Sequence, residues 1–307
     1  MRENIRVSVI VLTYNHERYI RRALDSVLSQ RTAFPYEVLV GDDGSTDQTA
    51  RILREYQQDG RGVLRLFLRK DNVGGTANLA GLLRCAEGKY IASCEGDDYW
   101  TDPGKLQKQV DFLESHTEYV GCTHPITLVD QNGVPCRKQS LWWIKDKAVF
   151  RLSDFQGIYL PGHPVSMVYR NIFAGDLSAV DLIARVHPQI GDRTIAMLLS
   201  LWGDIARLED TMACYRQMLS GDSGSLTARE FASNPLGKLT DMQITNRLEA
   251  YLRKERHLSV HFNSFRCRLV LRTLAKAVLC ASPAAFACLG NMVNEWRIFQ
   301  KEMKQRG

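Results

Sequence analysis

Three carboxylates follow one short uncharged run in this chain. Residues 94–100 read CEGDDYW, so Glu95, Asp97 and Asp98 come directly after the stretch 90–94. Like charges at this spacing repel each other unless a cation neutralises them or their pKa values are pushed apart. Such a cluster serves either to bind a hard cation such as Mg²⁺ or Mn²⁺ together with phosphates, or to perform acid–base catalysis. The structural alternative is a solvated acidic loop or helix start.

A second acidic group, GDDGSTD, occupies residues 41–47, where a strand pattern gives way to a helix pattern. Asp and Ser favour turns and helix N-caps, so part of this motif serves local structure, and Ser45 with Gln48 predicts a capping box. Asp42 or Asp43 at a strand end can also accept a hydrogen bond from a base N–H or a ribose hydroxyl. The segment TYN at 13–15 has the equivalent place after the first strand, and its tyrosine is either a base-stacking or a core residue.

Alternating strand and helix patterns position these acids. Strand patterns cover residues 7–14, 37–45, 63–69 and 89–94, and apolar residues at helical spacing follow each of them. Repeated strand–helix units predict an α/β fold with a mostly parallel sheet flanked by helices. Ligands of such sheets bind beyond the carboxyl ends of the strands. The two acidic groups should therefore face one crevice.

The pattern loosens after about residue 120. Asn132-Gly133 predicts a tight turn, and the segment 142–171, rich in aromatic residues, Gly and Pro, predicts loops with short strands. A helix returns at about 192–202, with Trp202 on its apolar face together with Ile195, Leu198 and Leu199. From about residue 226 the chain is expected to be helical and strongly basic.

Composition places the chain among ordinary globular proteins. Its 307 residues suffice for one large α/β domain or two closely joined halves, and the net charge of +6 favours anionic partners without naming one. The eight cysteines contain no CxxC pair, which argues against a zinc ribbon or a thioredoxin-like site. Scattered thiols in a chain of this size favour a reduced, cytoplasmic setting. The N-terminal apolar run lacks the layout of a signal peptide and is expected to form the first strand.

Four segments together carry a resemblance to a known family. They are VSVIVLTYNHERYIRRALDSVLSQ, YEVLVGDDGSTDQT, NVGGTANLAGLLRCAEGKYIASCEGDDYWTDPGKLQKQVDFLE and IGDRTIAMLLSLWGDIARLEDTMACYR, in this order. The chain resembles family 2 glycosyltransferases of the GT-A fold, and is most similar to bacterial members that build surface polysaccharides. The resemblance covers residues 5–225. It implies a Rossmann-like, mostly parallel sheet, a nucleotide-sugar donor and an inverting mechanism.

The resemblance implies roles for residues of the nucleotide pocket. Thr13 and Tyr14, with Asn15 beside them, match positions that line this pocket. Asp42 or Asp43 matches the acid that hydrogen-bonds the base, usually uracil. The remaining donor-binding residues that it implies are Asn72 and Gly74, which resemble an N-x-G loop beside the nucleotide, together with Glu95, Asp97, Asp98 and Trp100.

The resemblance also implies a metal site for Mn²⁺ or Mg²⁺. Asp97 and Asp98 match the acidic pair that touches the ribose and the metal, with Asp98 as the main ligand. Relatives often carry a histidine two residues after the arginine of the YR pair, but Met218 stands there, and Met is a poor ligand for a hard cation. Asp222 or water then fills that position, or the metal is held weakly. His163, in LPGHPVS, is a rival ligand whose alternative role is structural or acceptor-facing.

Asp192 matches the general base of the family. It opens the helix predicted at 192–202, and its alternative role is that of an N-cap, which Asp favours. A helix N-terminus also favours the ionised form that a base needs.

Trp100, Trp142 and Trp143 are either sugar-stacking or core residues.

These assignments predict an organisation and an activity. Residues 1–225 form a GT-A domain, with a nucleotide-sugar-binding half at 1–120 and an acceptor half with the base at 121–225, and residues 226–307 form a basic helical extension. The expected reaction moves a sugar from a nucleoside-diphosphate sugar, with UDP as the expected carrier, to a hydroxyl of a glycan or lipid-linked acceptor. The alternatives are a sugar nucleotidyltransferase, although an early Gly-rich phosphate loop is missing, and a non-catalytic scaffold that binds nucleotide sugars or carbohydrates. No nucleic-acid partner is expected.

The C-terminal segment suggests contact with a membrane surface. Residues 251–307 hold eleven Lys and Arg against three acids, and residues 277–293 carry no charge. Pro283 and Gly290 disfavour a membrane-spanning helix, whereas a basic helix with an apolar face fits the interface at the inner side of the cell membrane. The alternative is a helical pair that packs on the catalytic domain or on a partner subunit.

Overall fold

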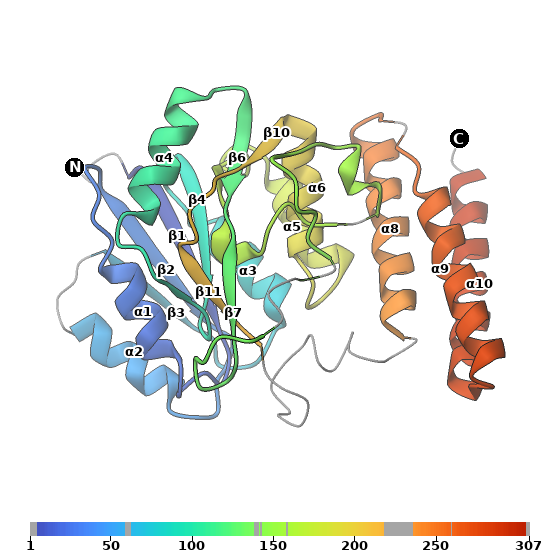
Figure 1. Ribbon diagram of the computed structural model, residues 1–307, viewed down its shortest axis with the longest axis horizontal. Helices are drawn as coiled ribbons and strands as arrows, with labels where there is room; N and C mark the ends of the chain where they lie inside the picture. The colour runs from blue at the N-terminus through green and yellow to red at the C-terminus, as the bar shows by residue number, and fades with distance from the viewer. Residues whose placement is uncertain are drawn as a thin grey trace. The chain divides into compact units, whose positions relative to one another are not determined.

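The computed structural model describes residues 5–58, 63–137, 141, 143–157, 159–217, 236–258 and 260–304. The chain forms two compact units, one made of Met1–Phe155 with Tyr159–Leu219 and the other of Gln156–Ile158 with Ser220–Gly307. The first unit holds the β-sheets and every motif discussed above up to the YR pair (Figure 1). The described part of the second unit from residue 236 onward consists of long helices.

An eight-stranded sheet is the centre of the first unit, in the order β3-β2-β1-β4-β9-β6-β10-β8. Its strands are β1 (Val7–Thr13), β2 (Tyr36–Asp42), β3 (Leu64–Leu68), β4 (Tyr90–Glu95), β6 (Tyr119–Thr123), β8 (Val149–Phe150), β9 (Val168–Arg170) and β10 (Asp204–Arg207). The four strands β3, β2, β1 and β4 are parallel, as are β6 and β10. β9 lies between β4 and β6 and is antiparallel to both. The mostly parallel α/β sheet expected from the sequence is confirmed.

A small second sheet lies beside the acidic turn that follows β4. It consists of β5 (Tyr99–Trp100), β11 (Ala213–Arg216) and β7 (Ile126–Val129), in the order β5-β11-β7. β11 is antiparallel to β5 and parallel to β7. The turn after β7 is the one that Asn132-Gly133 predicts: the Gly133 amide donates to the Asp130 carbonyl at 3.0 Å, and Gly133 has φ of +83°.

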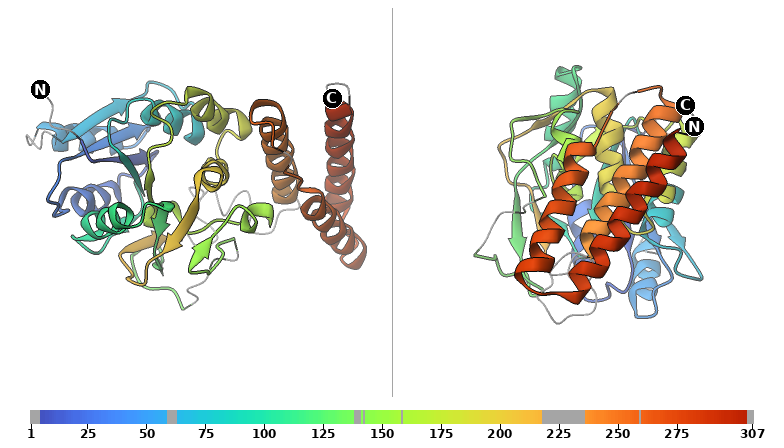
Figure 2. Two further views of the ribbon diagram at one scale, coloured as in Figure 1. Left: turned by 90° about the horizontal axis from the view of Figure 1, so that it is seen from above. Right: turned by 90° about the vertical axis from the view of Figure 1, so that its right-hand side faces the viewer.

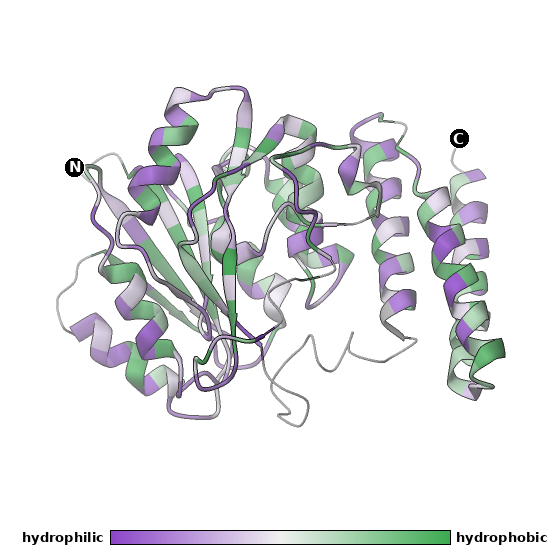
Figure 3. Ribbon diagram, viewed as in Figure 1, coloured by the Kyte–Doolittle hydropathy of each residue, from purple (hydrophilic) through white to green (hydrophobic). Residues whose placement is uncertain are grey.

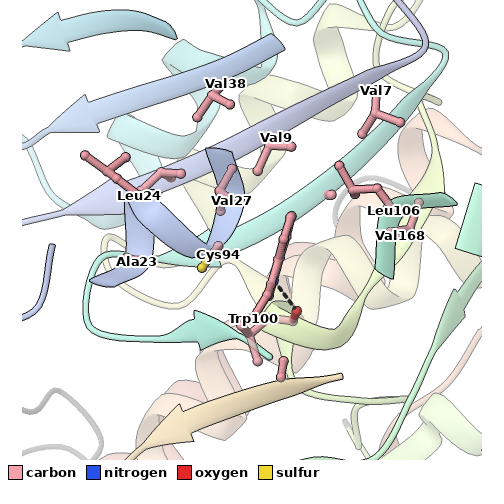
Figure 4. Close-up of a cluster of buried hydrophobic side chains, with 14 of the residues drawn as sticks. Val7, Val9, Ala23, Leu24, Val27, Val38, Cys94, Trp100, Leu106 and Val168 are labelled. Atoms are coloured by element: carbon pink, nitrogen blue, oxygen red, sulfur yellow. Dashed lines mark hydrogen bonds between the residues drawn. The ribbon is translucent and has the colours of Figure 1, made fainter. Parts of the chain in front are cut away.

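Helices α1 (Ile20–Leu28), α2 (Thr49–Gln58) and α4 (Lys105–Ser115) cover one face of the large sheet. Their apolar positions recur at helical spacing and pack against alternate residues of the strands, among them Val7, Val9 and Val38 (Figure 4). Alternate strand residues share a face, so this set defines one side of the sheet. The core formed here is buried almost completely and fixes the strand ends where the motifs lie.

Helices α3 (Gly75–Leu83), α5 (Leu177–Val186) and α6 (Asp192–Trp202) belong to the other face (Figure 2). Asn78 of α3 donates from Nδ2 to the Gly41 carbonyl of β2 at 2.8 Å, and a Cβ added at Gly41 would lie 2.5 Å from Asn78 Oδ1. A side chain at position 41 would therefore displace the Asn78 amide from this hydrogen bond. Short 3₁₀ turns occur at Asp154–Gly157 and Pro164–Ser166.

Two local expectations were wrong. Trp202, predicted on the apolar face of α6, is 62% exposed because it ends the helix beyond the last buried turn. Ser45 does not cap α2: its hydroxyl pairs with the Asp42 carboxylate and accepts the Asn15 amide at 2.9 Å. Asp47 instead accepts the amide of Thr49, the first residue of α2, at 2.9 Å.

The second unit contains α8 (Leu236–Glu255), α9 (Asn263–Leu279) and α10 (Pro283–Lys304), and α10 packs along both other helices (Figure 2). Met242, Leu269, Cys288 and Met292 form its core. Met292 and Cys288, both within the uncharged stretch 277–293, are therefore buried. Within the described ranges, no helix combines the length and the hydropathy required to cross a bilayer.

Candidate functional site

The turn after β4 carries the three acids of the CEGDDYW segment. The Gly96 amide donates to the Leu12 carbonyl of β1 at 2.8 Å, and the Asp98 amide donates to the Glu95 carbonyl at 3.0 Å. A Cβ added at Gly96 would lie 2.7 Å from Thr13 Oγ1, so glycine is required for the turn to rest against the end of β1. The acids are thereby held at the carboxyl ends of β1 and β4, where the sequence predicted a crevice.

Glu95, Asp98 and His163 come together at this edge. Each offers one ligand atom, and these atoms all lie within 4.8 Å of one another. His163 Nδ1 is 3.8 Å from Asp98 Oδ2. Asp98 is almost completely buried; its Oδ1 accepts the Arg216 amide at 2.9 Å, whereas its Oδ2 has no hydrogen-bond partner. Asp97 is not part of this group, and its Oδ2 lies 4.0 Å from His16 Nε2.

Burial and mutual repulsion shift the pKa values of this group. Burial, followed by the charges of Asp97 and Asp192, raises the pKa of Glu95 to about 8. Burial and the neighbouring acids also raise the pKa of Asp98 well above its ordinary value. Burial lowers the pKa of His163 to about 3, so its imidazole is neutral at physiological pH. Neutral imidazole is the form that coordinates metals, and a bound cation would stabilise both ionised carboxylates.

Asp192 lies at the start of α6, close enough to Glu95 for its charge to raise the pKa of that residue. The N-cap position belongs to Gly191, so Asp192 is the first helical residue and not the cap. Its Oδ1 accepts the Arg193 amide at 2.7 Å, and burial raises its pKa above the ordinary value. The carboxylate is half-buried, and the effect of burial on its pKa outweighs that of the helix N-terminus, which was expected to favour the ionised form.

The loops after β1 and β2 are joined to each other. Asn15, in the left-handed region with φ of +55°, accepts the Thr46 amide on Oδ1 at 2.8 Å. Tyr14 beside it is 43% exposed, so it is not a core residue and its ring remains available to a ligand. Thr13 is buried, and its Oγ1 has no hydrogen-bond partner.

Asp42 and Asp43 already have local partners. Asp42 pairs with the hydroxyl of Ser45, while the Asp43 carboxylate accepts the amides of Val73 at 2.9 Å and Gly74 at 3.0 Å. Asp43 therefore fixes the loop that contains Asn72 and Gly74. Asn72 is exposed, and Gly74 has φ of +92°, where a side chain would be strained. The structure thus brings one of the two predicted base-binding acids, Asp43, into direct contact with the predicted N-x-G loop.

Trp100 does not line this site. Trp100 is only 4% exposed, belongs to the core under α1 and donates from Nε1 to the Val165 carbonyl at 3.1 Å (Figure 4). Its assignment as a sugar-binding residue is wrong, because its ring is used in packing. Trp143 packs in a small cluster with Leu128 and Tyr215. Trp142, Met218 and Asp222 lie outside the described residues.

Arg216 is a residue of this region for which the sequence patterns predicted no role. It ends β11, is nearly buried and donates from Nε to the Asp97 carbonyl at 2.9 Å. Tyr215 beside it stacks on the His163 ring at 3.9 Å between centroids. The YR pair served only as a distance marker in the sequence, yet it supports both His163 and the acidic turn.

A mostly parallel sheet with helices on both faces and an acidic crevice at its strand ends is the GT-A architecture. The S. aureus protein TarS, residues 1–349 in complex with UDP-GlcNAc, has the same fold, with a TM-score of 0.57, 18% sequence identity, and coverage of 98% of this chain and 92% of that chain. The family model Glycosyl transferase family 2 matches residues 8–174. The chain belongs to this family.

Curated relatives agree with this placement. An uncharacterized protein of Mycobacterium tuberculosis is 40% identical over 216 residues, which is 70% of this chain and 60% of that protein. A Bacillus subtilis protein named for teichuronic acid biosynthesis, the glycosyltransferase TuaG, is 33% identical over 135 residues, which is 43% of this chain and 51% of that protein. The chain thus spans 60% of the length of the M. tuberculosis relative.

Proposed function

We propose that this protein is an inverting glycosyltransferase that moves a sugar from a nucleoside-diphosphate sugar to a hydroxyl of a glycan or lipid-linked acceptor. The proposal is carried by one observation. Asp192 lies close enough to Glu95 for its charge to raise the pKa of that residue, and Glu95 forms a group with Asp98 and His163 at the carboxyl ends of β1 and β4. Single displacement requires a base for the acceptor and a means of stabilising the leaving diphosphate, and we assign these roles to Asp192 and to the cation-binding group.

The chain's own residues fit a divalent cation such as Mn²⁺ or Mg²⁺. Asp98 Oδ2 is buried without a hydrogen-bond partner and faces His163 Nδ1, and both atoms belong to the group within 4.8 Å that Glu95 completes. Two carboxylates and an imidazole suit Mn²⁺ well, and carboxylates suit Mg²⁺. Asp97 is a nearby acid that would contact the cation through a water molecule or would contact the ribose of the donor. When bound, the cation would stabilise the negative charge of the leaving diphosphate.

Asp192 performs the proton transfer in this mechanism. Its carboxylate accepts the proton of the acceptor hydroxyl while that oxygen forms a bond to the anomeric carbon of the donor sugar. The bond between the anomeric carbon and the diphosphate oxygen breaks at the same time, and its electron pair leaves with the diphosphate. Attack from the face opposite the leaving group inverts the configuration. No covalent intermediate forms, so no protein nucleophile is needed.

A uridine nucleotide is the proposed carrier. The pocket would be formed by Thr13, Tyr14 and Asn15 after β1, by Asp42 or Asp43 after β2, and by the loop that holds Asn72 and Gly74. The exposed ring of Tyr14 supports this assignment. The TarS structure contains UDP-GlcNAc, which is consistent with UDP as the carrier.

The proposal is tested by measuring release of nucleoside diphosphate from a panel of UDP-, GDP- and TDP-sugars, with and without Mn²⁺. We expect cation-dependent release from one or a few UDP-sugars, and slower release from Asp192→Asn. Thermal-shift measurements with the same panel report binding independently of turnover. Binding without release from any sugar nucleotide would favour the non-catalytic scaffold.

A membrane surface is a further proposed partner, which would bring the enzyme to a lipid-linked acceptor. On α9, exposed apolar side chains at Leu271, Leu274 and Val278 lie beside an exposed basic row formed by Arg268, Arg272 and Lys276. Both sets recur every three or four residues, so each forms a stripe along the helix. Leu279 is 84% exposed and Phe286 is 50% exposed, and Figure 3 shows hydrophobic colour where α9 meets α10.

Sedimentation with liposomes tests this partner. Full-length protein should sediment with vesicles containing anionic lipid at low salt, and replacement of Arg268, Arg272 and Lys276 by Gln should release it, because each basic residue near an anionic surface contributes about 1 kcal/mol. The matched control replaces three exposed arginines of the other unit, Arg31, Arg54 and Arg137. Equal sedimentation of the two triple variants would contradict the proposal and favour packing of the helices on another protein surface.

A further inference from the structure

A small basic cavity lies beside the acidic turn, and no role described so far uses it. It has a volume of about 250 Å³ and is lined by Arg18, Tyr19, Arg22, Gln131, Asn132 and Arg216. Three of its six lining residues are arginines, and none is an acid. The cavity is smaller than the pockets of about 300–1,000 Å³ that hold typical small molecules. It suits one compact group and not a whole nucleotide sugar.

Two of the three arginines, Arg18 and Arg22, have no acidic partner in the part of the chain that the structure describes. Arg18 and Arg22 are exposed and form no salt bridge there, whereas their neighbour Arg21 is paired with Glu55. The Arg216 guanidinium donates only to carbonyl oxygens, from Nε to Asp97 and from Nη1 to the residues of the turn after β7. The charge of Arg216 also acts on Asp98. The two unpaired cations Arg18 and Arg22 still give the cavity a positive potential that attracts an anion.

Aromatic rings hold these cations in place. The guanidinium carbon of Arg22 lies 3.5 Å from the centre of the Tyr99 ring, and that of Arg216 lies 4.5 Å from the centre of the Tyr19 ring. Stacking on a ring restricts a guanidinium without using its N–H donors. The fixed donors of Arg22 can then form paired hydrogen bonds to two oxygens of a phosphate or carboxylate. Arg216 contributes mainly its charge, because its Nε and Nη1 already donate to carbonyl oxygens.

The cavity lies next to the acidic turn but is separate from the proposed donor site. Arg216 is bonded through its side chain to the Asp97 carbonyl and through its amide to the Asp98 carboxylate. The cavity therefore adjoins the acidic site, yet its lining shares no residue with the proposed cation group or with the nucleotide loops.

We propose that this cavity binds a phosphate or carboxylate group of the acceptor, so that the enzyme acts on an anionic acceptor. That the bound group belongs to an acceptor rests on the proposed function, whereas anion binding by the cavity does not depend on it. The diphosphate of the donor is the other anion that could occupy the cavity, so the experiment distinguishes it from an anionic group of the acceptor.

The test is calorimetric titration of inorganic phosphate into the full-length protein, with and without saturating UDP and Mn²⁺. We expect phosphate to bind in both conditions, and to bind at least about tenfold more weakly to the double variant Arg18→Gln/Arg22→Gln, as the loss of charge-assisted hydrogen bonds requires. Arg21→Gln removes one charge from the same helix outside the cavity and should leave phosphate affinity unchanged. Glycerol phosphate and methyl glucuronide, each compared with its neutral parent, then distinguish phosphate from carboxylate.

Each contrary result has a distinct meaning. Equal phosphate affinity in the wild type and the double variant, or no binding to the wild type, overturns the cavity as an anion site. Phosphate binding that disappears when UDP is present assigns the cavity to the donor diphosphate and overturns the acceptor role. Failure of the proposed function would appear separately, as absence of UDP-sugar binding and turnover while phosphate still binds in the cavity.

Discussion

The Nδ1 atom of His163 lies 3.8 Å from Oδ2 of Asp98, although the histidine precedes β9 and the aspartate follows β4 along the chain. Tyr215 stacks on the histidine ring, and the Arg216 amide binds the other oxygen of Asp98. Three segments distant in sequence thus fix one pair of ligand atoms. This arrangement supplies a histidine to the proposed cation site although Met218 stands where relatives often carry one.

The first prediction concerns that cation. His163→Asn should weaken Mn²⁺ binding to the UDP-bound protein by at least about tenfold, since even supporting residues of metal sites contribute about 10- to 100-fold. Calorimetric titration with Mn²⁺ measures the effect without relying on turnover. His116→Asn, at an exposed histidine paired with Glu118, is the control. An unchanged Mn²⁺ affinity in His163→Asn together with a lost affinity in Asp98→Asn would remove His163 from the ligand set and leave Asp98 in it.

The second prediction separates a base from a helix-stabilising residue at Asp192. Asp192→Asn keeps Oδ1, which accepts the Arg193 amide, but cannot accept a proton. Transfer should therefore fall by about 10²- to 10⁴-fold, the usual contribution of a general base, while UDP-sugar affinity stays nearly unchanged. Single-turnover rates and calorimetric binding constants measure the two quantities. Lost affinity with retained turnover at saturation would show that Asp192 only supports the fold of the pocket.

The third prediction concerns Lys105, which is fully buried at the start of α4 and whose Nζ has no hydrogen-bond partner. Burial lowers its pKa from 10.5 to about 7, and Nζ lies 4.3 Å from the Trp100 ring centre. Between these two pKa values the unfolded chain binds more protons than the folded chain. The free energy of unfolding should therefore rise with pH through this window as far as this residue contributes.

Lys105→Met should remove that rise and stabilise the protein at neutral pH. We expect a gain of about 1–3 kcal/mol, because one pKa unit corresponds to about 1.4 kcal/mol and the lost cation–π contact offsets part of the gain. Denaturant unfolding at several pH values measures both effects. Lys108→Met, on the exposed face of the same helix and paired with Asp102 and Asp210, is the control and should give no such gain. Destabilisation by Lys105→Met at all pH values would contradict the prediction.

The fourth prediction concerns the ion pair inside the helical unit. Arg266 Nη1 lies 2.7 Å from Glu249 Oε2, Arg266 is completely buried, and its guanidinium stacks over the Phe299 ring. Glu249→Gln leaves a buried cation without its counter-ion and should destabilise this unit by about 3–5 kcal/mol. Hydrogen exchange of α8 to α10 measures the loss. Glu55→Gln, which breaks an exposed pair with Arg21, is the control and should leave the stability nearly unchanged, because solvent screens such a pair.

Local patterns predicted the frame of the fold well. The strand at residues 7–14 and the helices with Ile20, Leu24, Leu106 and Leu113 on their inner faces are present, because period-2 and period-3.6 patterns report directly on burial. The acidic turn after β4 was predicted for the same reason. Local chemistry also located the turn at Gly133.

Features that depend on long-range contact could not be predicted from the sequence. His163 was one of several polar residues in a loosely patterned segment, and only the antiparallel strand β9 that follows it places it against Asp98. Trp100 had the same local signal whether it stacked on a sugar or packed in the core. The arginine cavity is assembled from α1, the turn after β7 and β11, so no single segment contained its pattern.

The position of β9 has a consequence for how the chain is made. β4 has β1 on one side and β9 on the other, and β9 is also what joins β4 to β6. Until Val168–Arg170 leaves the ribosome, β4 presents an open row of unpaired N–H and C=O groups, a template for pairing with other chains. The stretch 1–120 produced alone would therefore leave this edge of β4 unpaired beside the acidic turn, and we expect such a fragment to aggregate.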